Sequence, residues 1–199
     1  MEKMQKRLDN LEQQIDNNSA YERRDTLVIS GNIPASRPNE NCIEIVRNII
    51  KDQTRVIIDV NDISTAHRLG RRPDNGQEDK RSIIFKLCRR NTKREIIQAC
   101  KTSKPNFYVN EHLTPTRNTV MFALRKARQI NPSKIGVARA HEGNVTVLIP
   151  SAGSSSSSNN DNAGTSRRIT CNTRTALDEI LMQQLNITSD KFVKKWPVL

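Results

Sequence analysis

The sequence predicts an α+β protein whose centre is a four-stranded sheet of the ferredoxin-like plan. Two observations carry this prediction. Stretches with strand-like alternation and with helical spacing of apolar residues follow one another in the order β-α-β-β-α-β over residues 23–110. A heptad pattern precedes this module at residues 1–22, and a smaller C-terminal α/β domain follows at residues 111–187. The Ser/Asn-rich residues 151–166 are expected to form a disordered linker inside that domain, and residues 188–199 form a tail to which the sequence assigns no role.

Residues 1–22 predict a short coiled-coil helix. Apolar side chains recur at alternating steps of three and four, and the polar residues Asn18 and Glu22 follow in the same phase. Two heptads are too few for a stable isolated coiled coil, since helices shorter than ~12–15 residues are marginal alone. The segment is therefore expected to be the end of a longer helix, which we favour, or a helix that docks on its own protein. The predicted oligomerisation seam consists of Met4, Leu8, Leu11 and Ile15.

The first half of the central module contains two strands and a helix. The β-branched residues 26–31 predict a strand that ends in a glycine. A helix follows from Glu40, with one apolar face of about three turns. Residues 62–69 predict the second strand, and the loop after it, residues 71–80, is rich in turn-forming residues.

The second half of the module repeats the pattern of strand, helix and strand. Residues 81–88 alternate as a half-buried strand, and Phe85 shares its phase with apolar neighbours, which favours a place in the core over a base-stacking role. Thr92 and Glu95 have capping-box spacing and predict the start of a helix. Residues 107–110 predict the fourth strand.

The C-terminal domain is predicted to combine two helices with a hairpin. Thr114 and Pro115 are typical of the cap and first position of a helix. Residues 135–140 and 145–149 predict two strands around a turn. A last amphipathic helix follows the capping candidates Asn172 and Thr173, and its apolar stripe needs a surface to cover it, for which the hairpin is the nearest candidate.

The chain is strongly basic and its charge is uneven. The formal net charge is +12, and residues 66–104 alone contain 12 basic and 4 acidic residues. Because soluble surfaces usually mix both signs, this concentration indicates a footprint for nucleic acid, with a basic face kept for solubility as the alternative. In this plan the third strand is central and the second is its neighbour, so the basic side chains converge on one face and rim. The residues predicted to bind there are Arg68, Arg71 and Arg72, with their heads in solvent, and Arg81, Lys86, Arg89 and Arg90. The alternative for Arg68 is an ion pair with a carboxylate such as Glu44 or Asp62 that holds the helix to the sheet.

The sequence lacks the patterns of enzymes, metal sites and membrane proteins. The three histidines have unrelated contexts, without a nucleophile elbow, a metalloprotease motif or a Gly-rich phosphate loop, and His67 is interpreted as a polar surface or nucleic-acid contact. The four cysteines show no CxxC spacing, which argues against a zinc site and a disulfide framework. No stretch approaches the ~18 apolar residues of a membrane span. We therefore expect no catalysis, no metal or other cofactor, and no membrane partner.

RNA-recognition motifs share the β-α-β-β-α-β plan, and they stack bases on aromatic residues of the first and third strands. With Phe85 assigned to the core, the third strand offers no such residue. Backbone charge is then expected to dominate binding, with weak base selectivity. The expected partners are single-stranded RNA and DNA.

Five segments stand in an order that resembles a known family: YERRDTLVISG, AHRLGRRP, RSIIFKLCRRNTKREIIQACK, NFYVNEHLTPTRNTV and NTRTALDEILMQQLN. Over residues 1–187 the chain resembles the first-open-reading-frame protein of LINE-type (non-LTR) retrotransposons. The resemblance implies a trimerising coiled coil, an RNA-recognition-type domain and a small C-terminal domain. It also implies a non-enzymatic protein that coats the element's RNA in a cytoplasmic ribonucleoprotein particle, with the nucleus as a second location, and acts as a nucleic-acid chaperone in retrotransposition. The RNA contacts it implies fall on Arg68, Arg71, Arg72, Arg81 and Arg139.

A second interpretation belongs to another class of protein. A coiled-coil adaptor with a degenerate RNA-recognition fold would bind protein through its helices. Such surfaces usually use aromatic anchors, and the chain has only one Trp and two Tyr. The charge at residues 66–104 therefore favours nucleic acid.

Overall fold

A computed structural model of the chain describes residues 2–73, 78–150, 166–194 and 196–197. It confirms an α+β architecture with an N-terminal helix, a four-stranded antiparallel sheet with helices, and a three-stranded sheet with helices. The chain forms two compact units, one of residues 24–112 and one that joins residues 1–23 to residues 113–199. Apart from Ser166, the linker expected at residues 151–166 lies outside the described residues.

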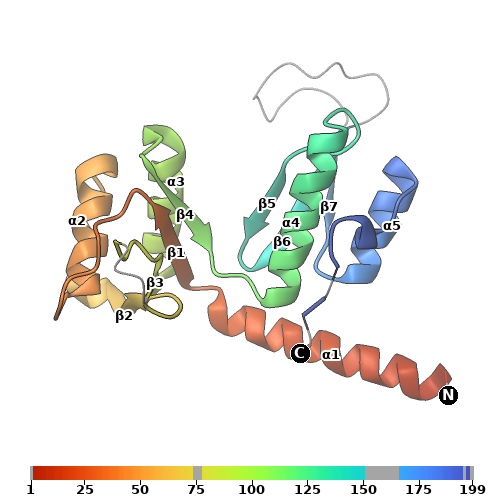
Figure 1. The fold of residues 1–199 in the computed structure, drawn as a ribbon, viewed down its shortest axis with the longest axis horizontal. Coiled ribbons are helices and arrows are strands. Elements are labelled where there is room, and N and C mark those ends of the chain that lie inside the picture. The colour runs from red at the N-terminus through yellow and green to blue at the C-terminus, as the bar shows by residue number, and fades with distance from the viewer. Residues whose placement is uncertain (1, 74–77, 151–165, 195, 198–199) are drawn as a thin grey trace. The chain divides into compact units, whose positions relative to one another are not determined.

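The unit of residues 24–112 contains the elements in the predicted order (Figure 1). These are β1 (Thr26–Gly31), α2 (Cys42–Thr54), β2 (Ile63–Arg68), β3 (Ile83–Leu87), α3 (Arg90–Ser103) and β4 (Phe107–Glu111). The strands pair antiparallel in the order β2-β3-β1-β4. The prediction that the third strand is central, with the second beside it, is confirmed.

Both helices of this unit pack on one face of its sheet. Leu27, Ile29 and Phe85 are completely buried from the strand side, and Ile50 and Ile96 reach them from α2 and α3. The prediction that Phe85 belongs to the core is therefore confirmed. Because side chains alternate along a strand, the residues between these core positions point to the other side of the sheet, which we call the opposite face. Its members are Thr26, Val28, Ser30, Thr65, His67, Ile84, Lys86, Tyr108 and Asn110.

The two helices of the unit begin differently. Asn41 caps α2, because its side chain accepts hydrogen bonds from the backbone N–H groups of Ile43 and Glu44. The helix α3 begins at Arg90 with Arg89 as its cap, three residues earlier than the sequence pattern indicated, and this cap residue makes no side-chain hydrogen bond. The capping box at Thr92 is therefore wrong: Thr92 already has helical neighbours on both sides and is largely buried.

The other unit contains α1 (Glu2–Arg23), α4 (Pro115–Ile130), β5 (Ala138–His141), β6 (Asn144–Ile149), β7 (Arg167–Thr170) and α5 (Arg174–Leu185). Its strands form an antiparallel sheet in the order β5-β6-β7. The caps at Thr114 and Thr173 are confirmed, since each side chain accepts a backbone hydrogen bond in the first turn. The strand β7 has no counterpart in the sequence prediction.

The tail of the chain belongs to the core of this unit. Val193 is buried among residues of α4, α5 and the small sheet, and Phe192 and Trp196 pack against the same cluster. The guanidinium of Arg174 lies 5.5 Å from the centre of the Trp196 ring. The one tryptophan of the chain thus has a structural place that the sequence pattern did not reveal.

Helix α1 docks on this unit through its second half. In Figure 1 it passes the N-terminal end of α4, and its residues Asp16 and Ala20 are buried. The docking expected as one alternative for the heptad segment is therefore present, on the unit that contains residues 113–199. No helix among the described residues is both long enough and apolar enough to cross a membrane.

Candidate nucleic-acid interface

Arg68 does not present its head to solvent, and that prediction is wrong. Its side chain is only 4% exposed, and Nε lies 2.9 Å from Oε1 of Glu40. The remaining donors reach Oε2 of Glu40 and the carbonyl oxygens of Pro34 and Arg81. The hydrogen bonds from Arg68 hold the pKa of the Glu40 carboxyl below its usual value. With its guanidinium committed to these partners, Arg68 fastens the end of β2 to the segment before α2.

Arg81 closes the base of the loop between β2 and β3. Its guanidinium makes a two-pronged pair with Asp79, with Nε 2.8 Å from Oδ1 and Nη2 2.8 Å from Oδ2, and it also donates to the carbonyl of Gly70. These bonds lower the pKa of Asp79 to about 2 and raise that of Arg81. Arg81 lies just before β3, not on it, and its side chain is 23% exposed.

Arg68 and Arg81 together support the loop that carries Arg71 and Arg72. Nη1 of Arg68 donates to the Arg81 carbonyl, and the Leu69 N–H donates to the Ser82 carbonyl at 2.7 Å. Arg71 and Arg72 follow Gly70, whose φ of +79° favours glycine, and both side chains are exposed. Arg68 and Arg81, both predicted to contact RNA, thus build the base on which Arg71 and Arg72 are presented.

Arg89 and Arg90 lie at the other end of β3. The side chain of Arg89 is 77% exposed with Nε 3.4 Å from Oδ1 of Asp62, and that of Arg90 is 48% exposed with Nε 3.6 Å from Oδ1 of Asp25. Exposed pairs at such distances stabilise a protein by only about 0–1 kcal/mol. Their guanidinium groups are therefore available to exchange these carboxylates for phosphates.

Lys86 belongs to β3, between these two groups of arginines, and lies on the opposite face of the sheet. It is exposed, and its ammonium makes no hydrogen bond or ion pair with any residue that the structure describes. Lys93, by contrast, is withdrawn from the basic surface: its Nζ lies 3.3 Å from Oε1 of Glu111 and also donates to the Arg24 carbonyl. The net charge counted from the sequence of residues 66–104 is therefore larger than the charge that this segment exposes to solvent.

Arg139 lies in the other unit, exposed on β5. Register places it opposite Thr146, on the side of the small sheet that faces away from the buried Val145 and Val147. Arg168 points to the same side from β7, since its partner Leu148 alternates with these core residues. Sequence reasoning missed Arg168 because it did not predict β7.

The opposite face of the four-stranded sheet also carries Asn110, Val28 and Ile84, which sequence reasoning did not select, and His67, which it interpreted as a polar surface or nucleic-acid contact. Asn110, Val28, Ile84 and His67 stand in register across all four strands. Tyr108 lies beside this row on β4 and is 69% exposed. The alternation of Phe107, Tyr108 and Val109 was the available signal, because it separates a buried ring from an outward one.

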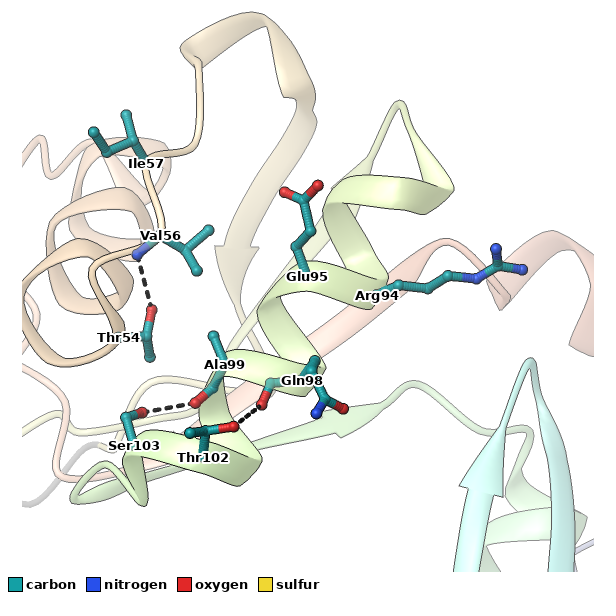
Figure 2. A pocket seen from close by; sticks show the side chains of 9 residues that line it. All are labelled: Thr54, Val56, Ile57, Arg94, Glu95, Gln98, Ala99, Thr102 and Ser103. Atoms are coloured by element: carbon teal, nitrogen blue, oxygen red, sulfur yellow. Dashed lines mark hydrogen bonds between the residues drawn. The ribbon is translucent and has the colours of Figure 1, made fainter.

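A groove opens on the helix side of the same unit (Figure 2). It has a volume of about 740 Å³ between the end of α2 and α3. Val56, Ile57 and Ala99 give it an apolar side, and Ile57 is 79% exposed. The hydroxyl groups of Thr102 and Ser103 donate to backbone carbonyls of α3, so they offer little polarity to a ligand.

The described residues contain no cluster of three or more His, Cys, Asp or Glu side chains that could hold a metal ion. No protein-family model matches the chain, and neither does any curated protein.

Proposed function

We propose that the chain binds single-stranded RNA and DNA through the opposite face of its four-stranded sheet, which includes Lys86, and through a basic rim formed by Arg72, Arg89 and Arg90 beyond the two ends of β3. The observation that carries the proposal is the exposure of Arg72, Lys86, Arg89 and Arg90 around one strand, β3, and the loop before it. Guanidinium and ammonium groups in this setting bind phosphates, and the release of counterions drives the association.

The strand order supports a ferredoxin-like, RNA-recognition-type domain. A central third strand beside the first, with both helices on one face, is the plan that these motifs share. Together with the resemblance of residues 1–187 to the LINE first-open-reading-frame proteins, it supports a ribonucleoprotein component and nucleic-acid chaperone of a non-LTR retrotransposon. Such a protein would act in the cytoplasmic particle and in the nucleus, and would self-associate through α1, as a trimer by resemblance.

The salt dependence of binding tests this proposal. If ~4–6 phosphates are contacted, the logarithm of affinity for a single-stranded oligonucleotide should fall against log salt with a slope of roughly −3 to −4, at about −0.7 per contact. Replacing Lys86, Arg89 and Arg90 together with Ala should flatten that slope by about 2. An affinity that ignores salt, or no binding at low salt, contradicts the proposal.

A matched control distinguishes the effect of these residues on binding from the effect of the protein's net charge. The exposed residues Lys51, Lys101 and Lys104 belong to α2, to α3 and to the C-cap of α3. Replacing these three with Ala removes the same charge away from the sheet. The slope should then change little; an equal flattening by both triple variants would show that the protein binds by overall charge alone.

The groove in Figure 2 favours a second candidate function, a protein-interaction adaptor that uses its helices. An exposed Ile57 beside Val56 and Ala99 is the kind of apolar surface that accepts a partner side chain. The oligonucleotide experiment distinguishes the adaptor from the nucleic-acid-binding protein, because an adaptor that makes no phosphate contacts should not show the salt-dependent affinity.

A further inference from the structure

Tyr108 has a conformation suited to stacking a base. Its ring lies against Gly31 of the neighbouring strand: a Cβ added at Gly31 would lie 3.2 Å from Cδ2 of Tyr108. One side of the ring is thus backed by the β1 main chain, while 69% of the residue remains exposed. A ring held in this way loses little conformational freedom when a planar ligand covers it.

The opposite face also carries a hydrogen-bonding side chain beside Tyr108 and a positive charge further along the sheet. Asn110 lies two residues along β4 in an exposed position. Lys86 lies two strands away, about 10 Å across the sheet, and is also displaced along it: Tyr108 pairs with Ser30, whereas Lys86 pairs with Thr26, four residues or about 13 Å along β1. Within the described part of the chain, the side chains of Tyr108, Asn110 and Lys86 form no hydrogen bond or ion pair.

We propose that Tyr108 stacks one base of a single-stranded nucleic acid that crosses the opposite face, with its backbone directed towards Lys86 and its base edge within reach of Asn110. This inference rests on the proposed function and adds a base contact to it. The usual arrangement places the stacking residues on the first and third strands. In this chain Val28 and Ile84 occupy the middle of those strands on the opposite face, and the exposed ring is on the edge strand β4.

Charge and chemistry favour nucleic acid over a protein as the occupant. The face combines one exposed aromatic ring with small polar side chains, Ser30 and Thr65, and a lysine. Aromatic rings interleaved with basic groups are typical of single-strand binding surfaces, where each base supplies a π-face and each phosphate a negative charge. A protein-binding face would need a larger apolar patch than Tyr108 and the half-buried Val28 provide.

The first test compares a single-stranded oligothymidylate with an abasic oligomer of the same length and charge. Removing one stacked base should weaken binding by about 5- to 150-fold, with the salt slope unchanged because no phosphate contact is lost. The wild-type protein should show this preference for bases, and Tyr108→Ala should abolish it. Tyr108→Phe should retain it, whereas Tyr108→Leu, which still covers Gly31, should not.

Phe122→Ala is the matched control, since Phe122 is a ring of similar exposure, at 49%, on α4 of the other unit. Circular dichroism melting establishes whether each variant is folded. If Tyr108→Ala does not fold, Tyr108→Leu and the abasic oligomer still decide the test. Salt-dependent binding that does not distinguish bases, or that Tyr108→Ala leaves intact, overturns this inference alone. If neither oligomer binds at low salt, the proposed function fails together with it.

Discussion

Nε of Arg117 on α4 lies 2.7 Å from Oδ2 of Asp16 on α1, and the two side chains are only 3% and 8% exposed. Every polar atom of this pair has a partner: Arg117 also donates to Asn17, Asn144 and the Gly143 carbonyl, and Asp16 accepts from Thr114. A buried ion pair is stabilising only when its remaining hydrogen-bonding sites are satisfied in this way. The pair therefore makes the second half of α1 an integral part of its unit.

We predict that Arg117→Ala destabilises this unit by about 3–5 kcal/mol, because it leaves the Asp16 carboxylate buried without its partner. Arg125→Ala, at an exposed position of the same helix, should change stability by no more than about 0.5 kcal/mol. Guanidinium denaturation followed by circular dichroism measures both. Equal effects of the two substitutions would contradict the role assigned to the pair.

The order of elements was predictable from the sequence because it depends on local periodicity. The strands at Thr26–Gly31 and Ile83–Leu87 show it clearly, and their hydrophobic alternation also identified Phe85 as core. The strand Arg167–Thr170 could not be found in this way, because it has four residues, only one of them apolar, and depends on pairing with β6.

The candidate site was predictable only as a region of charge. Which arginines face solvent is decided by carboxylates distant in the sequence, such as Glu40 for Arg68 and Asp16 for Arg117, and no spacing rule connects them. The alternation of Phe107, Tyr108 and Val109 marked Tyr108 as outward, but the support of its ring was not predictable from the sequence. This support depends on the register between β4 and β1 and on the glycine beside it, which are properties of the assembled sheet.

Arg68→Ala should lower the stability of the unit of residues 24–112 by about 3–5 kcal/mol, because Glu40 would lose its buried partner. Arg72→Ala, four residues further on and exposed, should leave stability unchanged and instead flatten the salt slope of oligonucleotide binding by about 0.7. Thermal melts and salt titrations on both variants test whether Arg68 supports the fold and Arg72 contacts phosphate. It is wrong if Arg68→Ala melts like the wild type.

Acid should destabilise the same unit through Asp79 and Glu40. The pKa of Asp79 falls from its ordinary 3.8 to about 2, mainly because Arg81 donates hydrogen bonds to it, and Arg68 lowers that of Glu40. A carboxyl with a lowered folded-state pKa contributes stability above its unfolded value and loses it as pH falls through the folded value. For Asp79 we therefore expect stability to decline from about pH 4 to about pH 2.

Urea denaturation at a series of pH values measures this decline. Asp79→Asn should reduce its steepness, because the group that titrates is absent. Asp52→Asn, at an exposed position of α2, is the control and should leave the profile unchanged. A profile for Asp79→Asn that coincides with the wild type would exclude the Arg81 pair as a source of acid sensitivity.

The four cysteines should differ widely in reactivity. Burial, together with smaller contributions from the charges of Asp178 and Glu179, raises the pKa of Cys171 to about 12, and burial also raises the pKa of Cys100. Because the thiolate is the reactive form, the exposed Cys88 should be alkylated first and Cys171 last. Mass spectrometry after brief treatment with iodoacetamide gives the order. In guanidinium all four should react alike, and rapid labelling of Cys171 in the folded protein would contradict its burial.

The helix α1 has one face that docks on its own unit and another that is exposed. The seam residues Met4, Leu8, Leu11 and Ile15 are 71%, 50%, 49% and 53% exposed. At 3.6 residues per turn, Asp16 and Ala20 lie roughly 110° and 150° around the helix from the centre of that seam. Docking therefore leaves the seam open, so that one helix can hold its own unit and contact further copies at the same time.

We predict weak, concentration-dependent self-association, because two heptads bury little apolar surface. Replacing Leu8 and Leu11 with Glu should reduce the protein to monomer, since like charges would then meet across the seam. Replacing Asn10 and Gln13 with Glu adds the same charge away from the seam, at exposed positions, and should leave assembly intact. Sedimentation velocity over a range of concentrations measures both. The prediction fails if the wild-type protein stays monomeric at high micromolar concentration, or if the two double variants behave alike.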